Sequence, residues 1–489
     1  PAQARPVFAL LTLCSAFVST AAVVPPATTS TLSAGFRLRS ADFPTPMMSR
    51  MAEHPINHDI YTIGMFSPLF RVDIHGEELS PQPVADVRAL GLTFNAFASG
   101  IDFDAEGNVY VCSHNGQILK GLYDANSDDF STWTLIRNLE TEIPVIGEHG
   151  FGGITIDRKA GTLYVNSGSI VSGSDPANPE PDYGINASIL SLNLDGTSMT
   201  VFARGIRNHF GLAVRRSDGR LFGVENASDC DYAEEFNMIL PGSHQGFPYR
   251  SASDRSGNDA GLYPDCDTTA PEGLTFTPAW GNLGPDGIPA QGDPGYVDGG
   301  VYFGFHPHST PTGIDFYEPS EMAPDANLFP ADYHGRAFVT RFGTIRPDNS
   351  PAGFDLLTLA LREQDRMFFT NAFLTDLANP LDVVCASNGN VYVLEFPGRL
   401  LEISYHAPSP TPVSHLARQQ NLRVIPQGSG YQVLQYRYSN GHSWVSPFQT
   451  GAGSVPYYPI TGEFIGLFYY DYGTARFAQA IYEMSDWLE

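Results

Sequence analysis

Lysine is almost absent from this 489-residue chain, which contains only Lys120 and Lys159. The 53 acidic residues outnumber the 27 basic ones, and the formal net charge is −26. A protein this acidic repels nucleic acids and anionic membrane surfaces, which argues against both as partners. Because lysine is so scarce, any positive charge that a binding site needs must come mostly from arginine.

Long apolar runs are equally scarce. The main one extends from Val7 to Val18, between Arg5 and the small residues at 19–22, and it is too short to span a bilayer. This order is typical of a secretory signal peptide, so we expect residues 1–22 to be a leader and the protein to be secreted, periplasmic or extracellular. No later segment of the sequence is predicted to span a membrane.

Cysteine is rare as well. Without Cys14 of the leader, an even number remains, namely Cys112, Cys230, Cys266 and Cys385. Their spacings match no zinc pattern, and no CxxCH motif for covalent haem is present. Cys230 and Cys266 flank one long insertion, and we predict a disulfide between them. Cys112 and Cys385 are expected on equivalent strands of an early and a late repeat, where they can be two buried free thiols.

Helical periodicity is also hard to find, and a β-type unit recurs instead. It consists of a Gly-apolar pair, alternating apolar residues, a turn with glycine, and an apolar strand with Tyr or Phe. Clear copies begin at Ser99, Gly152, Phe210 and Asn379, and a looser copy covers residues 312–343. Each is followed by a further strand, so the chain predicts an all-β propeller of four-stranded blades. The segment YTIGMFSPLFRVDI can supply a sixth blade; we expect six, with seven as the alternative.

The predicted domain order follows from these repeats. After the leader we expect an N-terminal extension over 23–54, the propeller over 55–405, a Pro-rich linker over 406–413 and a small β-rich appendage over 414–489. The appendage is dense in aromatic residues, which we interpret as core residues rather than as a glycan-binding platform.

One stretch, residues 205–249, concentrates polar chemistry. A strand–turn–strand unit surrounds Asp218-Gly219, with Arg207-Asn208 before it and an acidic run after it. The order R-N-x-x-G-L-A, D-G-x-L-F, E-N, F-N and P-G-x-x-x-G-F-P resembles the soluble quinoprotein glucose and sorbosone dehydrogenases. The resemblance covers roughly residues 95–405. It implies a six-bladed propeller that uses calcium and pyrroloquinoline quinone (PQQ) to oxidise a sugar or polyol, with an external electron acceptor.

The resemblance also implies roles for single residues. His149 lies in the H-x-x-G segment that holds the catalytic base, directly before a repeat strand. Arg207 and Asn208 match the pair that contacts the quinone, whose carboxylates suit a guanidinium fork. A further cofactor-binding arginine would be Arg341 or Arg346, each shifted relative to the family pattern. Without the resemblance, His149 is a histidine bonded to a loop carbonyl, and Arg207 a structural arginine between blade loops.

A calcium site is implied next to these residues. The backbone carbonyls of Ala227 and Ser228 match the place where family members bind the metal. Acidic side chains downstream offer the hard oxygen ligands that calcium accepts, although acidic loops of an acidic protein are often merely solvated. These side chains are Asp229, Asp231, Glu234 and Glu235.

Three departures from the family pattern leave other functions open. Ser169 stands where glucose-type members have an Asp that polarises the histidine, His209 replaces a proline, and Phe247 replaces a tryptophan. One alternative is a calcium-dependent lactonase or esterase with Glu225 and Asn226 as channel ligands. The other is a non-catalytic binding or surface propeller that has lost its cofactor site.

Overall fold

The computed structural model describes most of residues 32–406 and four strands beyond them. The ranges are 32–33, 35–76, 78–90, 97–142, 149–170, 184–227, 233–249, 270–284, 296–297, 301–302, 304–345, 351–406, 422–427, 431–436, 464–471 and 476–483. The remaining statements concern these residues.

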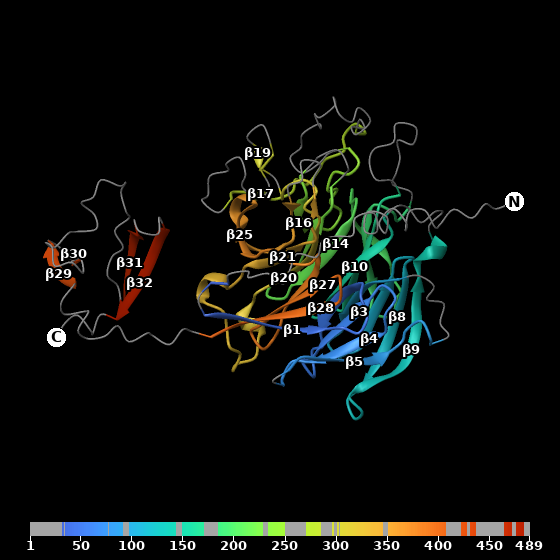
Figure 1. Ribbon diagram of the computed structural model, residues 1–489. Coiled ribbons are helices and arrows are strands. Elements are labelled where there is room, and N and C mark those ends of the chain that lie inside the picture. Colours follow the sequence, from blue (N-terminus) through green and yellow to red (C-terminus); the bar gives the residue numbers. More distant parts are fainter. Residues whose placement is uncertain are drawn as a thin grey trace. The chain divides into compact units, whose positions relative to one another are not determined.

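Six β-sheets form a closed ring, a six-bladed β-propeller (Figure 1). The inner strand of each blade contacts the inner strand of the next, and the sixth contacts the first. The inner strands are β2 (Met48–Glu53), β6 (Ala98–Phe103), β10 (Phe151–Asp157), β14 (His209–Arg215), β20 (Pro311–Phe316) and β26 (Pro380–Cys385). The predicted all-β class is confirmed, and the blade number is six rather than seven.

The outer strands follow in antiparallel order within each blade. Blade one adds β3 (Ile60–Gly64), β4 (Leu69–Asp73) and β5 (Ser80–Ala85); blade two adds β7 (Val109–Ser113), β8 (Gln117–Asp124) and β9 (Asp129–Asn138). Blade three adds β11 (Thr162–Ser167), β12 (Ser188–Asn193) and β13 (Thr200–Arg204); blade four adds β15 (Arg220–Glu225) and β16 (Glu235–Ile239). Blade five adds β21 (Ala337–Arg341), β24 (Asp355–Arg362), β25 (Met367–Leu374) and the short parallel β17 (Gly281–Asn282).

Blade six is completed from the far end of the sequence. It consists of β26, β27 (Val391–Glu395), β28 (Arg399–Tyr405) and β1 (Phe36–Asp42), which pairs antiparallel with β28. Both β1 and β2 precede residue 55, so the propeller begins earlier than the sequence predicted. Neither strand has the Gly-apolar start of the other repeats, and β1 is mostly half-buried or exposed, which leaves no clear alternation to detect.

Small elements lie in the connections between strands, most of them within blade five. They are the pairs β18 (Tyr296–Val297) with β19 (Val301–Tyr302) and β22 (Thr344–Ile345) with β23 (Pro351–Ala352), and the 3-10 turns η1 (Leu139–Glu142), η2 (Pro319–Glu321), η3 (Ala331–Tyr333) and η4 (Glu363–Asp365). Within the described ranges no helix has the length and apolar character needed to cross a membrane.

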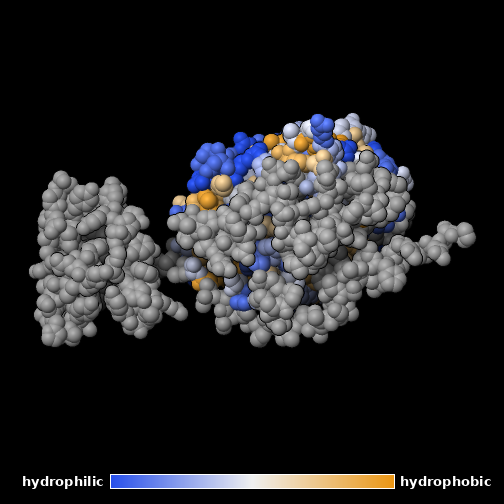
Figure 2. Space-filling model, turned by 90° about the horizontal axis from the view of Figure 1, so that it is seen from above, coloured by the Kyte–Doolittle hydropathy of each residue, from blue (hydrophilic) through white to orange (hydrophobic). Residues whose placement is uncertain are grey.

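Apolar side chains fill the spaces between neighbouring blades. Between blades four and five, for example, the ring of Phe236 lies 5.7 Å from that of Phe222 and 5.6 Å from that of Trp280. All three are fully buried, and burial of such a side chain contributes about 1.5–3 kcal/mol. On the outside, hydrophobic and hydrophilic areas lie side by side when the molecule is seen from above (Figure 2).

The inner strands are also joined by polar contacts across the channel. Arg50 of β2 donates from Nε to the carbonyl of Ser99 (3.2 Å) and from Nη1 to those of Thr312 and Leu381 (3.1 Å each). It also donates to the carbonyl of Phe210. A single buried guanidinium therefore connects its own blade to four others.

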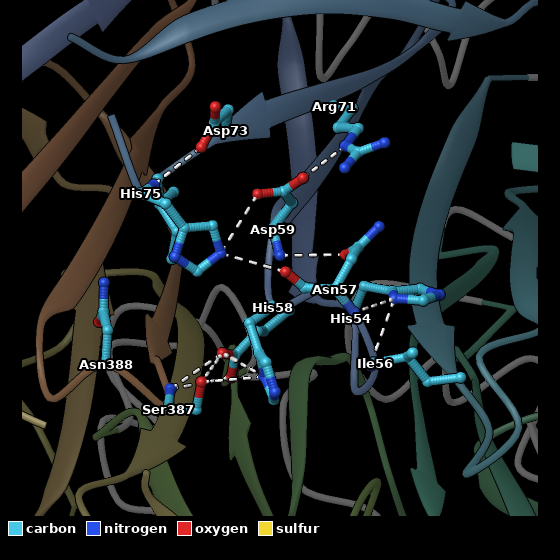
Figure 3. A network of polar contacts seen from close by, with 12 residues as sticks. His54, Ile56, Asn57, His58, Asp59, Arg71, Asp73, His75, Ser387 and Asn388 are labelled. Atoms are coloured by element: carbon cyan, nitrogen blue, oxygen red, sulfur yellow. Dashed lines mark hydrogen bonds and ion pairs between the residues drawn. The ribbon is translucent and has the colours of Figure 1, made fainter. Parts of the chain in front are cut away.

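We call the end of the channel at which the inner strands begin the top, and the other end the bottom. At the bottom, the loop after β2 makes a polar network (Figure 3), in which Arg71 pairs with Asp59. His58 Nδ1 lies 3.0 Å from Ser387 Oγ and 3.6 Å from Glu53 Oε1, which joins the loop to blade six. A cavity of about 270 Å³ opens beside it. Its lining carries charges of both signs, including Glu53, Asp102, Arg158, Arg216 and Asp315.

A second compact unit comprises residues 408–489, separate from 1–407. It contains two antiparallel hairpins, β29 (Leu422–Gln427) with β30 (Tyr431–Tyr436) and β31 (Phe464–Asp471) with β32 (Arg476–Glu483). The division lies within the expected linker over 406–413.

The cysteines are placed differently from the expectation. Cys112 and Cys385 are buried and free, as predicted. They are not on equivalent strands, however, because Cys112 is on the second strand of its blade and Cys385 ends the first strand of its own. Cys230 and Cys266, the predicted disulfide, lie outside the described residues.

Candidate functional site

The top of blades three and four brings several of the predicted residues together. His149 lies just before β10, and Arg207 lies just before β14, on adjacent blades. The backbone N–H of His149 donates to the carbonyl of Ser169 (3.2 Å), whose own N–H donates to the carbonyl of Arg207 (2.8 Å). The carbonyl of Asn208 accepts from the N–H of Asn226 (3.1 Å). The proposed base, cofactor pair and metal loop therefore share one end of the channel.

The Nε2 atom of His149 is buried and has no hydrogen-bond partner among the described residues. Burial lowers the pKa of His149 well below its usual value, and the positive charge of Arg207 and the nearby His114 lower it further. A Cβ on Gly168 would lie 2.5 Å from that of His149, so this approach requires glycine. The imidazole is therefore neutral, with a free nitrogen available to accept a proton.

Arg207 is 5% exposed and held at both ends. Its Nη1 donates to the carbonyl of Asn226 (3.0 Å), and its backbone N–H donates to Glu225 Oε1. Burial and the neighbouring Glu235 raise the pKa of Glu225 well above its usual value. Next to it lies His209, the residue that replaces the family proline. Its Nδ1 is 3.3 Å from Glu225 Oε2 without the alignment of a hydrogen bond, and burial lowers its pKa to about 3.

The acidic side chains that the structure describes are engaged by protein groups. Glu234 Oε2 accepts from the backbone of Ala227 (2.6 Å), and its Oε1 accepts from that of Thr310 (3.4 Å). Burial raises the pKa of Glu234 to about 7. Glu235 accepts a hydrogen bond from Asn237 Nδ2 (2.9 Å). Glu234 thus ties the proposed metal loop to the segment before blade five.

A side-chain metal cluster is not found in the described part of the chain, where no three His, Cys, Asp or Glu residues are placed to hold one ion. The implied calcium site depends instead on backbone carbonyls, of which Ala227 is described. Ser228, Asp229 and Asp231 lie outside the described residues.

Buried polar atoms without partners gather around His149 and Arg207. Besides His149 Nε2, they include Asn226 Oδ1, Asn186 Oδ1 and both amide atoms of Asn166. Each such atom costs about 1–3 kcal/mol if nothing satisfies it, so their concentration indicates the place of a polar ligand. The unpaired amide oxygens accept hydrogen bonds, so they fit hydroxyl or N–H groups of a ligand, or a cation such as calcium. The carboxylate and carbonyl groups of a cofactor would instead need donors, which Arg207 and Asn166 Nδ2 can supply. The sequence did not point to Asn166 or Asn186; the available signal was an Asn beside the last residue of a repeat's second strand.

The two later arginines contribute differently. Arg341 ends β21 and is buried, and it makes a two-pronged ion pair with Asp355, from Nε to Oδ1 (2.8 Å) and from Nη2 to Oδ2 (2.5 Å). This partner in its own blade occupies the donors that a cofactor would use first. Arg346 lies outside the described residues.

At the level of sequence, the similarity of this chain to known proteins is limited. No family model matches the sequence. The chain is 25% identical over 267 residues to a Borreliella burgdorferi protein described as uncharacterized, a match that covers 52% of this chain and 59% of that protein. The chain therefore spans about three fifths of that curated relative.

Solved structures share the propeller. A calcium structure of a Trichoderma reesei carbohydrate-active enzyme of family AA12 matches with a TM-score of 0.55 and 16% identity, over 77% of this chain and 97% of that one. The holo form of the pyranose dehydrogenase PQQ domain from Coprinopsis cinerea matches with a TM-score of 0.52 and 15% identity, over 78% and 98%. At these identities the likeness concerns the fold, and it confirms the fold that the sequence resemblance implied.

Proposed function

Starting from a propeller fold shared with PQQ-dependent sugar dehydrogenases, we propose that this protein is an exported, calcium- and PQQ-dependent dehydrogenase of a sugar or polyol. The observation that carries the proposal is the buried, unpartnered Nε2 of His149 beside the buried cation of Arg207. A neutral imidazole and a fixed positive charge at one end of a channel suit the removal of a proton from a hydroxyl group. In this proposal an external acceptor takes the electrons.

In this proposal His149 Nε2 accepts the hydroxyl proton of the substrate. Arg207 and Asn208 bind anionic and carbonyl groups of the cofactor, and the Ala227 carbonyl with Asn226 Oδ1 would hold calcium. PQQ, when bound, supplies the oxidant that accepts hydride. The Glu225 contact with the Arg207 backbone and the Glu234 contact with Ala227 keep these groups in position.

Ser169 bears on the strength of the base. Its carbonyl accepts from the backbone of His149, and no carboxylate contacts the His149 ring within the described residues. Because no anion stabilises the protonated imidazole, His149 is a weaker base than a histidine paired with an aspartate.

Reconstitution tests the proposal. Purified protein should bind PQQ in the presence of calcium, seen as a change in cofactor absorbance, and should then reduce a dye with a sugar or polyol as substrate. His149→Ala should lower turnover about 10²- to 10⁴-fold while PQQ still binds, because a general base acts mainly on the rate. Arg207→Ala should weaken PQQ binding by about 1.5–3 kcal/mol, the size of a hydrogen bond to a charged group.

The matched control is Ile56→Ala, which changes an exposed side chain in the loop after β2, at the bottom of the channel. It should leave both PQQ binding and turnover unchanged. Absence of any calcium-dependent PQQ binding would contradict the proposal. The protein would then be better described as a non-catalytic binding propeller, a possibility that the Arg341–Asp355 pair favours.

A further inference from the structure

Three aromatic rings form a row at the top of blades one and two. Phe66 follows β3, Phe97 precedes β6, and His114 follows β7. The rings of Phe97 and His114 stack with centroids 4.4 Å apart and planes at 24°, and Phe66 meets Phe97 edge-on at 6.4 Å. The two end rings are the accessible ones, because Phe66 is 50% exposed and His114 is half-buried, whereas Phe97 between them is 6% exposed. The row therefore presents an exposed apolar ring at one end and a half-buried polar ring at the other.

The inner end of this row touches the segment that holds the proposed base. The N–H of Phe151 donates to the carbonyl of His114 (2.8 Å). A Cβ on Gly150 would lie 2.5 Å from both Cε1 and Nε2 of His114, so the imidazole packs directly against the residue after His149. The two histidines are close enough for His114 to affect the pKa of His149.

The polar part of the row is the half-buried imidazole of His114. The His114 ring makes no hydrogen bond with any described residue, and the side chain is partly exposed. Burial lowers the pKa of His114 to about 4, so its ring is neutral at ordinary pH and can both donate and accept a hydrogen bond. A neutral hydrogen-bonding ring beside an exposed apolar ring matches the two surfaces of a sugar, its hydroxyl rim and its C–H face.

We propose that Phe66, Phe97 and His114 form a saccharide-binding wall beside His149. His114 contacts the sugar ring that faces His149, and Phe66 stacks on the next ring of a disaccharide or longer saccharide. Phe97 supports both, because it is stacked under His114 and touches Phe66. The assignment of the first ring to His149 rests on the proposed dehydrogenase function, whereas the wall itself is defined by the three rings.

Two variants separate the contributions of the wall. Phe66→Ala should raise the KM for cellobiose about 10-fold, the size of one aromatic stacking contact, and leave kcat and the KM for glucose unchanged. His114→Phe retains the stack on Phe97 but loses the ring nitrogens, so it should raise the KM for both sugars. Leu122→Ala, which shortens an exposed side chain on the outer strand β8, is the matched control and should alter neither KM.

Binding without turnover distinguishes this inference from the dehydrogenase proposal. Calorimetric titration of the protein with cellobiose, maltose and glucose should show tighter binding of at least one disaccharide than of glucose, lost in Phe66→Ala. If this holds while no sugar is oxidised, the wall is real and the dehydrogenase proposal fails. If sugars are oxidised but Phe66→Ala leaves the disaccharide-to-glucose KM ratio unchanged, or if no saccharide binds, the wall proposal is overturned.

Discussion

Replacing Glu234 by glutamine tests whether this buried carboxylic acid keeps its proton up to neutral pH in the folded protein. Glu234 is 5% exposed, and burial raises its pKa from 4.5 to about 7. Between these pH values the folded protein retains a proton that the unfolded chain has released, so the free energy of unfolding falls as the pH rises. Each pH unit costs about 1.4 kcal/mol, and the wild type should therefore lose on the order of 3 kcal/mol through this group.

Glu234→Gln removes the titration but keeps an oxygen for the N–H of Ala227. Its free energy of unfolding should therefore fall less steeply between pH 5 and pH 7 than that of the wild type. Urea unfolding of both proteins at pH 5, 6, 7 and 8, with a chelator present, measures the two slopes. Comparison of slopes is needed because the glutamine NH₂ also faces the N–H of Thr310, which lowers stability at every pH.

Added calcium turns the same assay into a test of the metal site. A cation next to Glu234 favours the charged carboxylate, so saturating calcium should flatten the wild-type slope and change the variant little. Equal slopes for the two proteins without calcium would refute the reasoning, because Glu234 would not hold the shifted proton. A wild-type slope that calcium leaves unaltered would remove Glu234 from the calcium site.

Two further changes test the channel and the base. Arg50→Met leaves four backbone carbonyls without their shared donor and should lower the free energy of unfolding, measured with urea, by about 3–5 kcal/mol. A loss below about 1 kcal/mol would contradict the role of Arg50 as a link between blades. Gly168→Ala places a Cβ 2.5 Å from that of His149 and should lower kcat at temperatures at which the variant is still folded, whereas Gly76→Ala, whose Cβ would meet nothing closer than 3.5 Å, should change neither kcat nor the melting temperature. Equal effects of the two variants on kcat would show that the approach to His149 does not matter.

The blades could be predicted because each repeat carries its own local signal. The alternation of Ile and polar residues at the end of β10 predicts a strand, although the structure buries all seven of its residues. The glycine turn that follows predicts the hairpin, so both signals can be recognised without knowledge of the rest of the chain. The first strand, β1, was missed because its partner β28 comes from the other end of the propeller. Its half-buried pattern becomes meaningful only after the ring is closed.

Only part of the candidate site could be recognised in the sequence, again because local signals do not report distant contacts. The family resemblance singled out His149 and Arg207, and their place directly before inner strands puts both at the same end of the channel. Glu234 is predicted to be a metal ligand, and nothing in the sequence indicated that its oxygens also accept from backbone groups, one of them on Thr310 before blade five. Likewise, the pair of Arg341 with Asp355 depends on strand order within blade five. Which acceptor a donor binds depends on residues that are distant in the sequence, and a local sequence pattern does not identify them.

The pairing of β1 with β28 determines when, during synthesis of the chain, the propeller can close. Residue 36 is made early and residue 405 late, yet the two are partners in one sheet. Contacts of such long sequence separation are slow to form, because the intervening chain must first be ordered. The ring thus stays open until nearly the whole propeller has been synthesised. Until then β1 has no partner strand, so the native ring can form only after the last blade has been synthesised.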